Sequence, residues 1–158
     1  MIRYEAINNE NRQDVLRFLR EAWQSTDMYV RGERVDMTRA DGICAYAGTA
    51  LVGLITFRAR DGVGEILSFN SLREGEGIGS SLLGRCLDTL RAEGCTRVVL
   101  ITTNDNLHAL GYYQRRGFDL IALYLNTMEE TRRHKPGIPL IGENGIPLRH
   151  EIELAMNL

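Results

Sequence analysis

The chain has 158 residues, of which 44% are hydrophobic and 25% charged, and its formal net charge of −2 is typical of one soluble globular domain. No basic stripe interleaved with aromatic residues points to a nucleic-acid partner, and no apolar run approaches the roughly 20 residues that span a membrane. The start of the chain lacks the apolar segment of a signal peptide, so we expect a cytoplasmic protein.

The first forty residues predict a strand, a helix and a polar segment, in that order. The strand is expected at Ile2–Ile7, and Asn11 is expected to cap the helix that follows, with Asp14 in its first turn. The segment Ser25–Thr38 is polar and mixed in charge, and its pattern is compatible with a second short helix. Apolar residues at helical spacing mark the core face of the first helix: Val15, Phe18, Leu19, Ala22 and Trp23.

The next thirty residues read as an antiparallel meander. Ile43–Ala47 and Ala50–Ala59 are expected as strands joined by a hairpin turn at Gly48-Thr49. Asp61-Gly62 is a second turn signal, and Gly64–Leu72 is expected to form the third strand of the meander.

The second half predicts alternating helices and strands. A helix whose apolar stripe runs from Ile78 to Leu90 is expected to stop at Gly94. Asn104 or Asp105 is expected to cap another helix. The remaining expected elements are strands at Val98–Ile101 and Phe118–Leu125, a long loop or arm at residues 127–150 that holds all three prolines, and a last strand at Glu151–Leu158.

This order predicts an α/β (α+β) fold in one domain, residues 1–158. We expect a single mixed, mostly antiparallel central sheet of six or seven strands with helices on both faces. The three cysteines, Cys44, Cys86 and Cys95, are odd in number and form no Cys-x-x-Cys pair, so neither disulfides nor a zinc site is indicated. We expect them to be reduced and to act as small hydrophobic residues.

A glycine-rich turn connects the meander to the helix that begins near Ile78. The turn reads Glu74-Gly75-Glu76-Gly77-Ile78-Gly79-Ser80. Glycines allow positive φ and close backbone approach, and the first turn of a helix offers unpaired N–H groups at the positive end of its dipole. The pattern predicts an anion site, such as one for a diphosphate.

Two other phosphate-binding patterns resemble this turn, and the chain departs from both. A P-loop requires a lysine after the last glycine, where this chain has Ser80. A dinucleotide fingerprint requires a third glycine at Ser80 and an acidic residue after the next strand, which ends instead in Thr103-Asn104. The turn alone therefore indicates an anion beside a helix and leaves the ligand open.

A second motif, Asn106 to Phe118, comes about thirty residues later. It reads Asn-Leu-His-Ala-Leu-Gly-Tyr-Tyr-Gln-Arg-Arg-Gly-Phe. With Gly77 and Gly79 of the turn, it resembles the two motifs of the GNAT family of acetyl-CoA-dependent N-acetyltransferases, and the order of strands agrees as well. The turn departs from the family at Glu74, where Arg or Gln is usual. Because Glu74 and Glu76 add negative charge, they weaken diphosphate binding unless both point to solvent.

The resemblance implies acetyl transfer from acetyl-CoA to a primary amine by direct attack, with no metal. The acceptor is expected to be a small molecule or a peptide, and a homodimer is possible from family habit. The alternative is a non-catalytic acyl-CoA-binding or regulatory domain, since fold does not fix function. The residues expected to bind the cofactor are Leu67, Phe69, Glu74, Gly75, Gly77, Ile78, Gly79, Ser80, Asn106 and Tyr113.

The resemblance also assigns roles in the reaction. Tyr113 occupies the position whose hydroxyl protonates the CoA thiolate; the alternative is a core tyrosine on a helix face. Asn106 is expected to contact CoA, or to be a plain helix cap. The backbone N–H of Phe69 is expected to polarise the thioester carbonyl, with a β-bulge near Ser68 or Asn70. Glu65 is the one candidate base, acting through water from the same strand face as Leu67 and Phe69; a solvated strand-end glutamate is the alternative.

The C-terminal arm resembles that of a bacterial GNAT subgroup of unassigned substrate. The stretch Gly145 to Glu153 reads Gly-Ile-Pro-Leu-Arg-His-Glu-Ile-Glu, and His150 replaces the Asp of that subgroup. The acceptor is expected to enter between Ser25–Thr38 and this arm. The candidate contacts are Asp27, Arg31, Glu33, Arg34 and Asp36 in the first segment and His134, Arg149 and His150 in the second.

Overall fold

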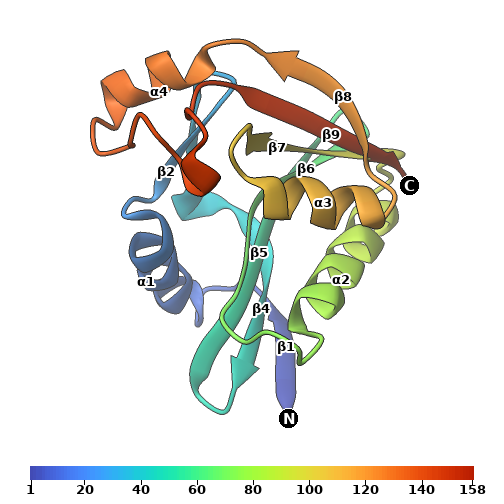
Figure 1. The fold of residues 1–158 in the computed structure, drawn as a ribbon. Helices are drawn as coiled ribbons and strands as arrows, with labels where there is room; N and C mark the ends of the chain where they lie inside the picture. The colour runs from blue at the N-terminus through green and yellow to red at the C-terminus, as the bar shows by residue number, and fades with distance from the viewer. The chain divides into compact units, whose positions relative to one another are not determined.

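The computed structural model describes all residues of the chain, Met1–Leu158, in two compact units (Figure 1). The first unit comprises residues 1–28, 36–98 and 158, and the second comprises residues 29–35 and 99–157. The elements are β1 (Ile2–Ala6), α1 (Arg12–Trp23), β2 (Asp27–Val30), β3 (Glu33–Asp36), a 3-10 turn (Met37–Arg39), β4 (Asp41–Ala47), β5 (Ala50–Arg60), β6 (Val63–Ser71), α2 (Ile78–Ala92), β7 (Arg97–Thr103), α3 (Leu107–Arg115), β8 (Asp119–Tyr124), α4 (Thr127–His134), a 3-10 turn (Glu143–Gly145) and β9 (Glu151–Asn157).

The predicted fold class is confirmed. The main strands number seven, in the order β1-β4-β5-β6 in the first unit and β7-β9-β8 in the second, and β2 and β3 form a separate hairpin. The pairs β1–β4, β4–β5, β5–β6 and β8–β9 are all antiparallel. No helix is long and apolar enough to cross a membrane.

The meander of the first unit has the predicted turns. Asp61 and Gly62 join β5 to β6 with φ of 54° and 77°, the two positive values that a tight hairpin turn requires. Gly48 and Thr49 form the predicted turn between β4 and β5. Short turns of this kind set the strand register, so the local sequence was sufficient to predict this part of the sheet.

Helices cover both faces of the sheet in the first unit (Figure 1). A Cβ added at Gly53 of β5 would lie 2.9 Å from Ile78 and 3.0 Å from Leu82, so α2 packs directly on this face. Ala45 points the same way, whereas its neighbour Tyr46 points to the other face and donates its hydroxyl hydrogen to Asp14 of α1 at 2.9 Å.

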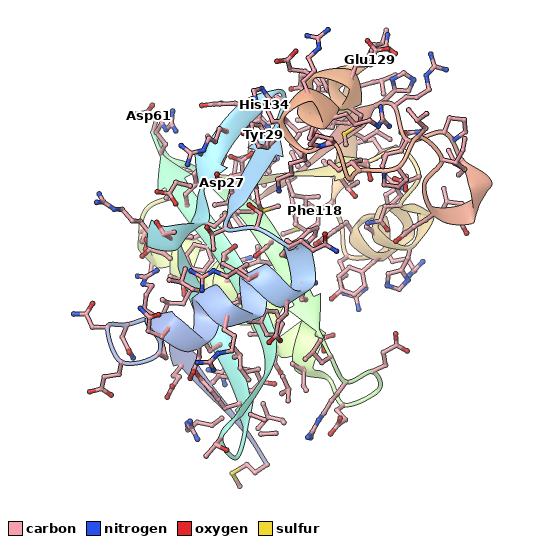
Figure 2. All side chains as sticks on the ribbon, turned by 90° about the vertical axis from the view of Figure 1, so that its left-hand side faces the viewer. Asp27, Tyr29, Asp61, Phe118, Glu129 and His134 are labelled. Atoms are coloured by element: carbon pink, nitrogen blue, oxygen red, sulfur yellow. The ribbon has the colours of Figure 1, made fainter.

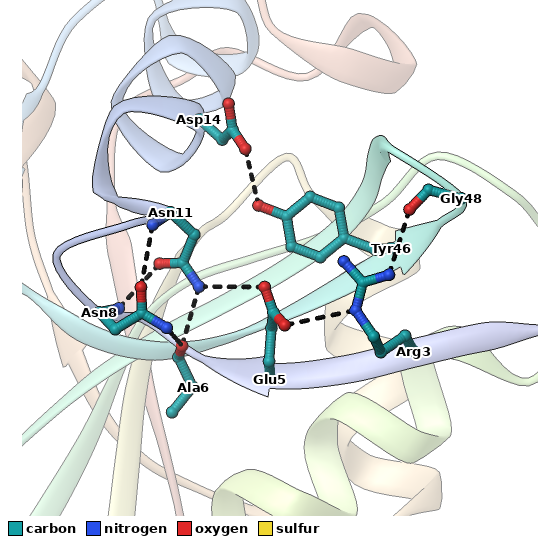
Figure 3. Close-up of polar contacts among 8 residues, drawn as sticks. All are labelled: Arg3, Glu5, Ala6, Asn8, Asn11, Asp14, Tyr46 and Gly48. Carbon is teal, nitrogen blue, oxygen red and sulfur yellow. Dashed lines mark hydrogen bonds and ion pairs between the residues drawn. The ribbon is translucent and has the colours of Figure 1, made fainter.

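The start of α1 differs from the prediction. The Asn11 side chain makes no capping bond to the helix; instead its Oδ1 accepts from the backbone N–H of Asn8 at 2.8 Å, and its Nδ2 donates to the carbonyl of Ala6 at 2.9 Å (Figure 3). Asn8 Oδ1 accepts in turn from the Asn11 N–H at 2.9 Å. Asn11 therefore joins the end of β1 to the helix, because its buried amide can satisfy both segments.

The segment Ser25–Thr38 forms a hairpin and not the second short helix that its pattern suggested. Its turn residues Arg31 and Gly32 have φ of 53° and 75°, which an α-helix excludes. Val30 and Val35, one on each strand, are buried. Two β-branched residues that flank a glycine-containing turn are a signal for a hairpin. The prediction missed this signal because most neighbouring residues are charged.

Two expectations in the second unit were also wrong. Neither Asn104 nor Asp105 caps α3: the cap is Asn106, whose Oδ1 accepts from the backbone N–H of Ala109 at 3.1 Å. The expected long loop at residues 127–150 begins with the two-turn helix α4. The prolines all lie beyond this helix, so they end it and do not prevent it.

The cysteines are small buried residues, as predicted. Cys44 and Cys86 are fully buried, Cys95 nearly so, and none is in a disulfide. Burial, with a smaller contribution from nearby carboxylates, raises the pKa of Cys44 to about 12, and burial likewise raises the pKa of Cys86 to about 12. Neither thiol is therefore ionised at neutral pH.

Candidate functional site

The glycine-rich turn is an exposed loop that leads from β6 into α2. Gly75 and Gly77 have φ of 76° and 75°, a left-handed conformation that other residues adopt only with strain. A Cβ built on either glycine would meet no atom within 4 Å. The space beside this backbone is thus open, and the glycines are required by the conformation of the chain.

The N-terminus of α2 has no side-chain cap. Gly77 is the N-cap residue, and the intrahelical bonds begin with the N–H of Ser81, which donates to the Gly77 carbonyl at 3.0 Å. The N–H groups of Ile78, Gly79 and Ser80 precede this bond. Ile78 is buried against Gly53 and holds the helix start in place. This end of the helix can bind an anion such as a diphosphate.

Charged side chains around the turn point to solvent. Glu74 and Glu76 are both exposed, which is the condition under which they least disturb a bound anion. Glu76 forms an ion pair with Arg73 at 3.8 Å, and both side chains are about half exposed, at 47% and 46%. Arg73 was not among the predicted site residues. Its position two residues before the first glycine, Gly75, was the only signal in the sequence.

The strand β6 contains a β-bulge at Leu67. Ile66 pairs with Phe57 and Ser68 pairs with Thr56, so Leu67 stands opposite no residue of β5. The bulge was expected near Ser68 or Asn70 and is found directly beside Ser68. The bulge interrupts the ladder at Leu67, whereas Phe69 stays paired with Ile55, so the role of the Phe69 N–H stays a prediction.

The bulge also corrects one prediction: Glu65 does not share a face with Phe69. Glu65 pairs with Arg58 and Phe69 pairs with Ile55, and paired residues lie on the same face. Since Arg58 and Ile55 are three positions apart on β5, they point to opposite faces. The extra residue in β6 shifts the alternation by one, which strand periodicity alone could not reveal.

A row of polar pairs follows the face of β5 and β6 that is turned toward α1. Thr56 and Ser68 are fully buried, and their hydroxyl oxygens are 2.6 Å apart. At one end of the row, Asn70 Oδ1 accepts from the indole N–H of Trp23 at 3.1 Å. At the other, Glu65 accepts from Arg58. The opposite face carries glycine and apolar residues against α2, so the two faces differ in chemistry.

The candidate base Glu65 is buried and ion-paired. Its Oε1 accepts from Nη2 of Arg58 at 2.7 Å and from Nε at 3.0 Å. Both hydrogen bonds converge on one carboxylate oxygen, so the Arg58–Glu65 contact is a charge-assisted pair. Arg58 was not predicted as part of the site, although an arginine within an otherwise apolar strand was a usable signal. The base role of Glu65 stays a prediction.

Asn106 and Tyr113 lie on α3 in the second unit. The Oδ1 of Asn106 is used in capping, as described above, so a CoA contact would come from its amide nitrogen. Tyr113 is 8% exposed, and its ring packs edge-on against Phe118 at a centroid distance of 5.4 Å. This packing fits a core tyrosine as well as a hydroxyl positioned for proton transfer, and both assignments stay predictions.

The hairpin tip and the C-terminal arm meet within the second unit. The rings of Tyr29 and His134 stack at 4.8 Å with an interplanar angle of 9° (Figure 2). The backbone N–H of Arg31 donates to Glu151 at 2.9 Å, and its guanidinium pairs with Glu153 at 3.1 Å. Two candidate acceptor contacts, Arg31 and His134, therefore make contacts between the hairpin and the arm.

Glu151, the first residue of β9, is 2% exposed. Burial raises the pKa of Glu151, and the hydrogen bond from Arg31 opposes this only in part. Burial and the hydrogen bond to Glu153 also raise the pKa of Tyr124, whose hydroxyl donates to Glu153 at 3.0 Å. Sequence reasoning missed Tyr124 and both glutamates, because strand alternation does not reveal which polar residues are buried.

His150 acts as a hydrogen-bond acceptor in the arm. Its Nδ1 accepts from the backbone N–H of Asn126 at 2.9 Å, which fixes the tautomer with the proton on Nε2. A carboxylate at this position can accept the same bond, so the change from the Asp of the resembled subgroup preserves the contact. No group of three or more His, Cys, Asp or Glu side chains is placed to hold a metal ion.

Comparisons with known proteins agree with the fold. Residues 8–118 match the family described as Acetyltransferase (GNAT) family. The uncharacterized protein YxbD of Bacillus subtilis (strain 168) is 37% identical over 142 residues, which are 89% of this chain and 89% of that protein.

Two solved structures share the fold over the length of the chain. The IAA acetyltransferase from Bacillus cereus ATCC 14579 has a TM-score of 0.74 and 23% identity, and 100% of each chain is covered. A GNAT family acetyltransferase from Elizabethkingia anophelis with acetyl-CoA bound has a TM-score of 0.71 and 19% identity, covering 99% of this chain and 98% of that one. The family match and the relative of similar length together show that this chain belongs to the GNAT family of acetyltransferases.

Proposed function

We propose that the protein transfers the acetyl group of acetyl-CoA to a primary amine by direct attack. The observation that carries the proposal is the exposed, uncapped N-terminus of α2 with open space beside Gly75 and Gly77. The bound acetyl-CoA in the Elizabethkingia anophelis relative of the same fold supports acetyl-CoA as the donor. The CoA diphosphate would bind the N–H groups of Ile78, Gly79 and Ser80, which are the first in the helix.

The reaction forms one bond and breaks one. The neutral amine nitrogen attacks the thioester carbon, an amide forms, and the carbon–sulfur bond breaks to release the CoA thiolate. A primary amine with a pKa of about 10 is mostly protonated at neutral pH, so one proton must leave before attack. In this proposal that proton passes through water toward Glu65. Tyr113 donates a proton to the thiolate, and the proton that the nitrogen loses as the amide forms returns through water to Tyr113.

The other assigned contacts serve the donor. The N–H of Phe69, two residues beyond the bulge at Leu67, would polarise the thioester carbonyl. The amide nitrogen of Asn106 would contact the CoA chain from α3.

The acceptor would be a small molecule or a peptide. The protein would act in the cytoplasm and could form a homodimer. Through the arm at residues 127–150, the protein would belong to the bacterial GNAT subgroup that this arm resembles.

The second candidate is a non-catalytic acyl-CoA-binding domain. The observation that favours it is the ion pair of Glu65 with Arg58, which occupies the candidate base. Calorimetry with acetyl-CoA and a thiol-release assay on a panel of primary amines separate the two. We expect binding and amine-dependent release of CoA. Binding without release on any amine supports the second candidate, and absence of acetyl-CoA binding rejects both.

A further inference from the structure

Trp23, the only tryptophan of the chain, is held in a fixed orientation at the protein surface. It is the last residue of α1 and is 41% exposed, so the prediction that it lies on the core face of the helix was wrong. Its indole N–H donates to Asn70 Oδ1 at 3.1 Å, across 47 positions of sequence. The hydrogen bond orients the indole at the surface, where the exposed part of its ring can stack on a ligand.

The Trp23 ring differs from several tyrosine rings of the protein in lacking a cation. Arginine guanidinium groups lie over three tyrosine rings at 3.4 to 4.9 Å, and the Lys135 ammonium lies 5.9 Å from a fourth. Tryptophan binds cations better than tyrosine, yet no cation or aromatic ring of the protein stacks on Trp23. The tyrosines with a cation are Tyr4, Tyr29, Tyr46 and Tyr112.

The end of α1 favours a positive charge beside this ring. The last carbonyl groups of a helix lack intrahelical partners and carry the negative end of its dipole. The chain turns sharply after Trp23, because Gln24 adopts the left-handed conformation with φ of 59°. Arg20 is the only basic residue in the last turn, and it is exposed to solvent.

Trp23 lies across the strand from the proposed donor site. Its partner Asn70 directly follows Phe69 on β6, and successive strand residues point to opposite faces. Phe69 shares the face of Gly53, on which the N-terminus of α2 packs, whereas Asn70 shares the face of α1. A group bound on Trp23 therefore lies beside the end of β6 without competing for the α2 turn.

From this geometry we propose that Trp23 and Asn70 form the binding subsite for the acceptor, and that the acceptor is a cationic alkylamine whose ammonium group rests on the Trp23 ring before it loses a proton. The inference rests on the proposed function and adds the acceptor class and its site. Trp23 is the contact residue. Asn70 is a positioning residue that acts by fixing the indole.

The single tryptophan gives a direct binding test that needs no turnover. We titrate tetramethylammonium, a cation that cannot be acetylated, and follow the fluorescence of Trp23, with tert-butanol as a neutral probe of similar size. We expect a saturable change with the cation alone. Equal responses to both probes, or no response to the cation, overturn the inference. In Asn70→Ala, which frees the indole, the apparent affinity for tetramethylammonium should fall several-fold.

Kinetics with the best amine of the panel supply the second test. Trp23→Ala should raise the KM for the amine about 5- to 30-fold with little change in kcat, and Trp23→Phe should raise it less, because a weaker aromatic face remains. Leu123→Ala removes a comparably exposed apolar side chain, 57% exposed on β8, and should change neither constant. An unchanged KM in Trp23→Ala, with folding confirmed by thermal denaturation, overturns the inference.

Calorimetry with acetyl-CoA keeps the two proposals apart. If the wild-type protein does not bind acetyl-CoA, the proposed function fails, whatever Trp23 does. If wild-type and Trp23→Ala proteins bind acetyl-CoA equally and differ only in the KM for the amine, both proposals stand. If Trp23→Ala loses acetyl-CoA binding while it remains folded, Trp23 serves the donor and the acceptor subsite is rejected.

Discussion

The two units of the chain are stabilised by different kinds of contact. In the first unit, apolar side chains of α2 close on glycines of the sheet: a Cβ at Gly64 would lie 2.6 Å from Leu90, and Gly53 makes similar contacts. In the second unit, polar side chains bind backbone groups of a segment that has little regular structure. The first arrangement follows from periodic patterns, whereas the second depends on single residues.

The arm of the second unit shows how such contacts work. Asn104 Oδ1 accepts the N–H groups of Arg149 and His150 at 3.0 and 2.9 Å. Asp105 is buried and accepts from Glu143 N–H at 2.8 Å. Arg132 donates to the carbonyls of Pro139 and Leu148. Three side chains thus satisfy backbone groups that no strand or helix pairs, so each one matters.

The largest expected effect lies in the first unit, at Gly77. Gly77→Val strains a residue with φ of 75° and fills the open space beside the turn, so acetyl-CoA affinity should fall by more than about 100-fold. Calorimetry measures the affinity for acetyl-CoA. Gly48→Val is the matched control, since Gly48 has φ of 61° and equally open surroundings in the β4–β5 turn. If both variants bind acetyl-CoA equally, the turn does not contact the cofactor.

The second unit should respond most to Asp105→Ala. The change leaves the N–H of Glu143 and the hydroxyl of Thr103 without their acceptor, and should reduce the free energy of unfolding by about 2 to 4 kcal/mol. Urea denaturation measures the loss. Asp119→Ala, at the exposed start of β8, is the control and should change stability little. If Asp105→Ala reduced the free energy of unfolding by less than Asp119→Ala does, other contacts would hold the arm in place.

Tyr113→Phe tests whether the second unit also contributes chemistry. Removing the hydroxyl keeps the ring against Phe118, so we expect normal stability and a 10- to 100-fold lower turnover, with little change in acetyl-CoA affinity. Thiol release under saturating substrates measures turnover. Full turnover in this variant would remove Tyr113 from the mechanism and leave it as a core residue.

Local sequence patterns predict most of the first unit and less of the second. The meander, its turns, α2 and the exposed glycine-rich turn follow from local patterns that the structure confirms. The bulge at Leu67 could be expected near its position, but its effect on the face of Glu65 depends on register with β5. The hairpin at Ser25–Thr38 and the helix α4 were missed, because charged residues there mask weak apolar signals. The Arg58 side chain stands out within an apolar strand, but its pairing with Glu65 depends on the register between β5 and β6.

The smallest expected effect distinguishes two buried glutamates, one in each unit. Glu151 is buried and its pKa is raised, so between its unfolded and folded pKa values the folded state holds more protons and stability falls as pH rises. Glu151→Gln keeps an oxygen for the Arg31 N–H and removes the charge.

We therefore expect Glu151→Gln to raise the melting temperature slightly at pH 8 and to leave it unchanged near pH 4, where the wild-type carboxyl is protonated. Glu65→Gln is the counterpart in the first unit. Because it leaves Arg58 without its charged partner, it should lower the melting temperature at pH 8. Thermal denaturation at the two pH values measures both variants. A lower melting temperature in both would show that Glu151, like Glu65, is stabilised by its contacts more than it is disfavoured by burial.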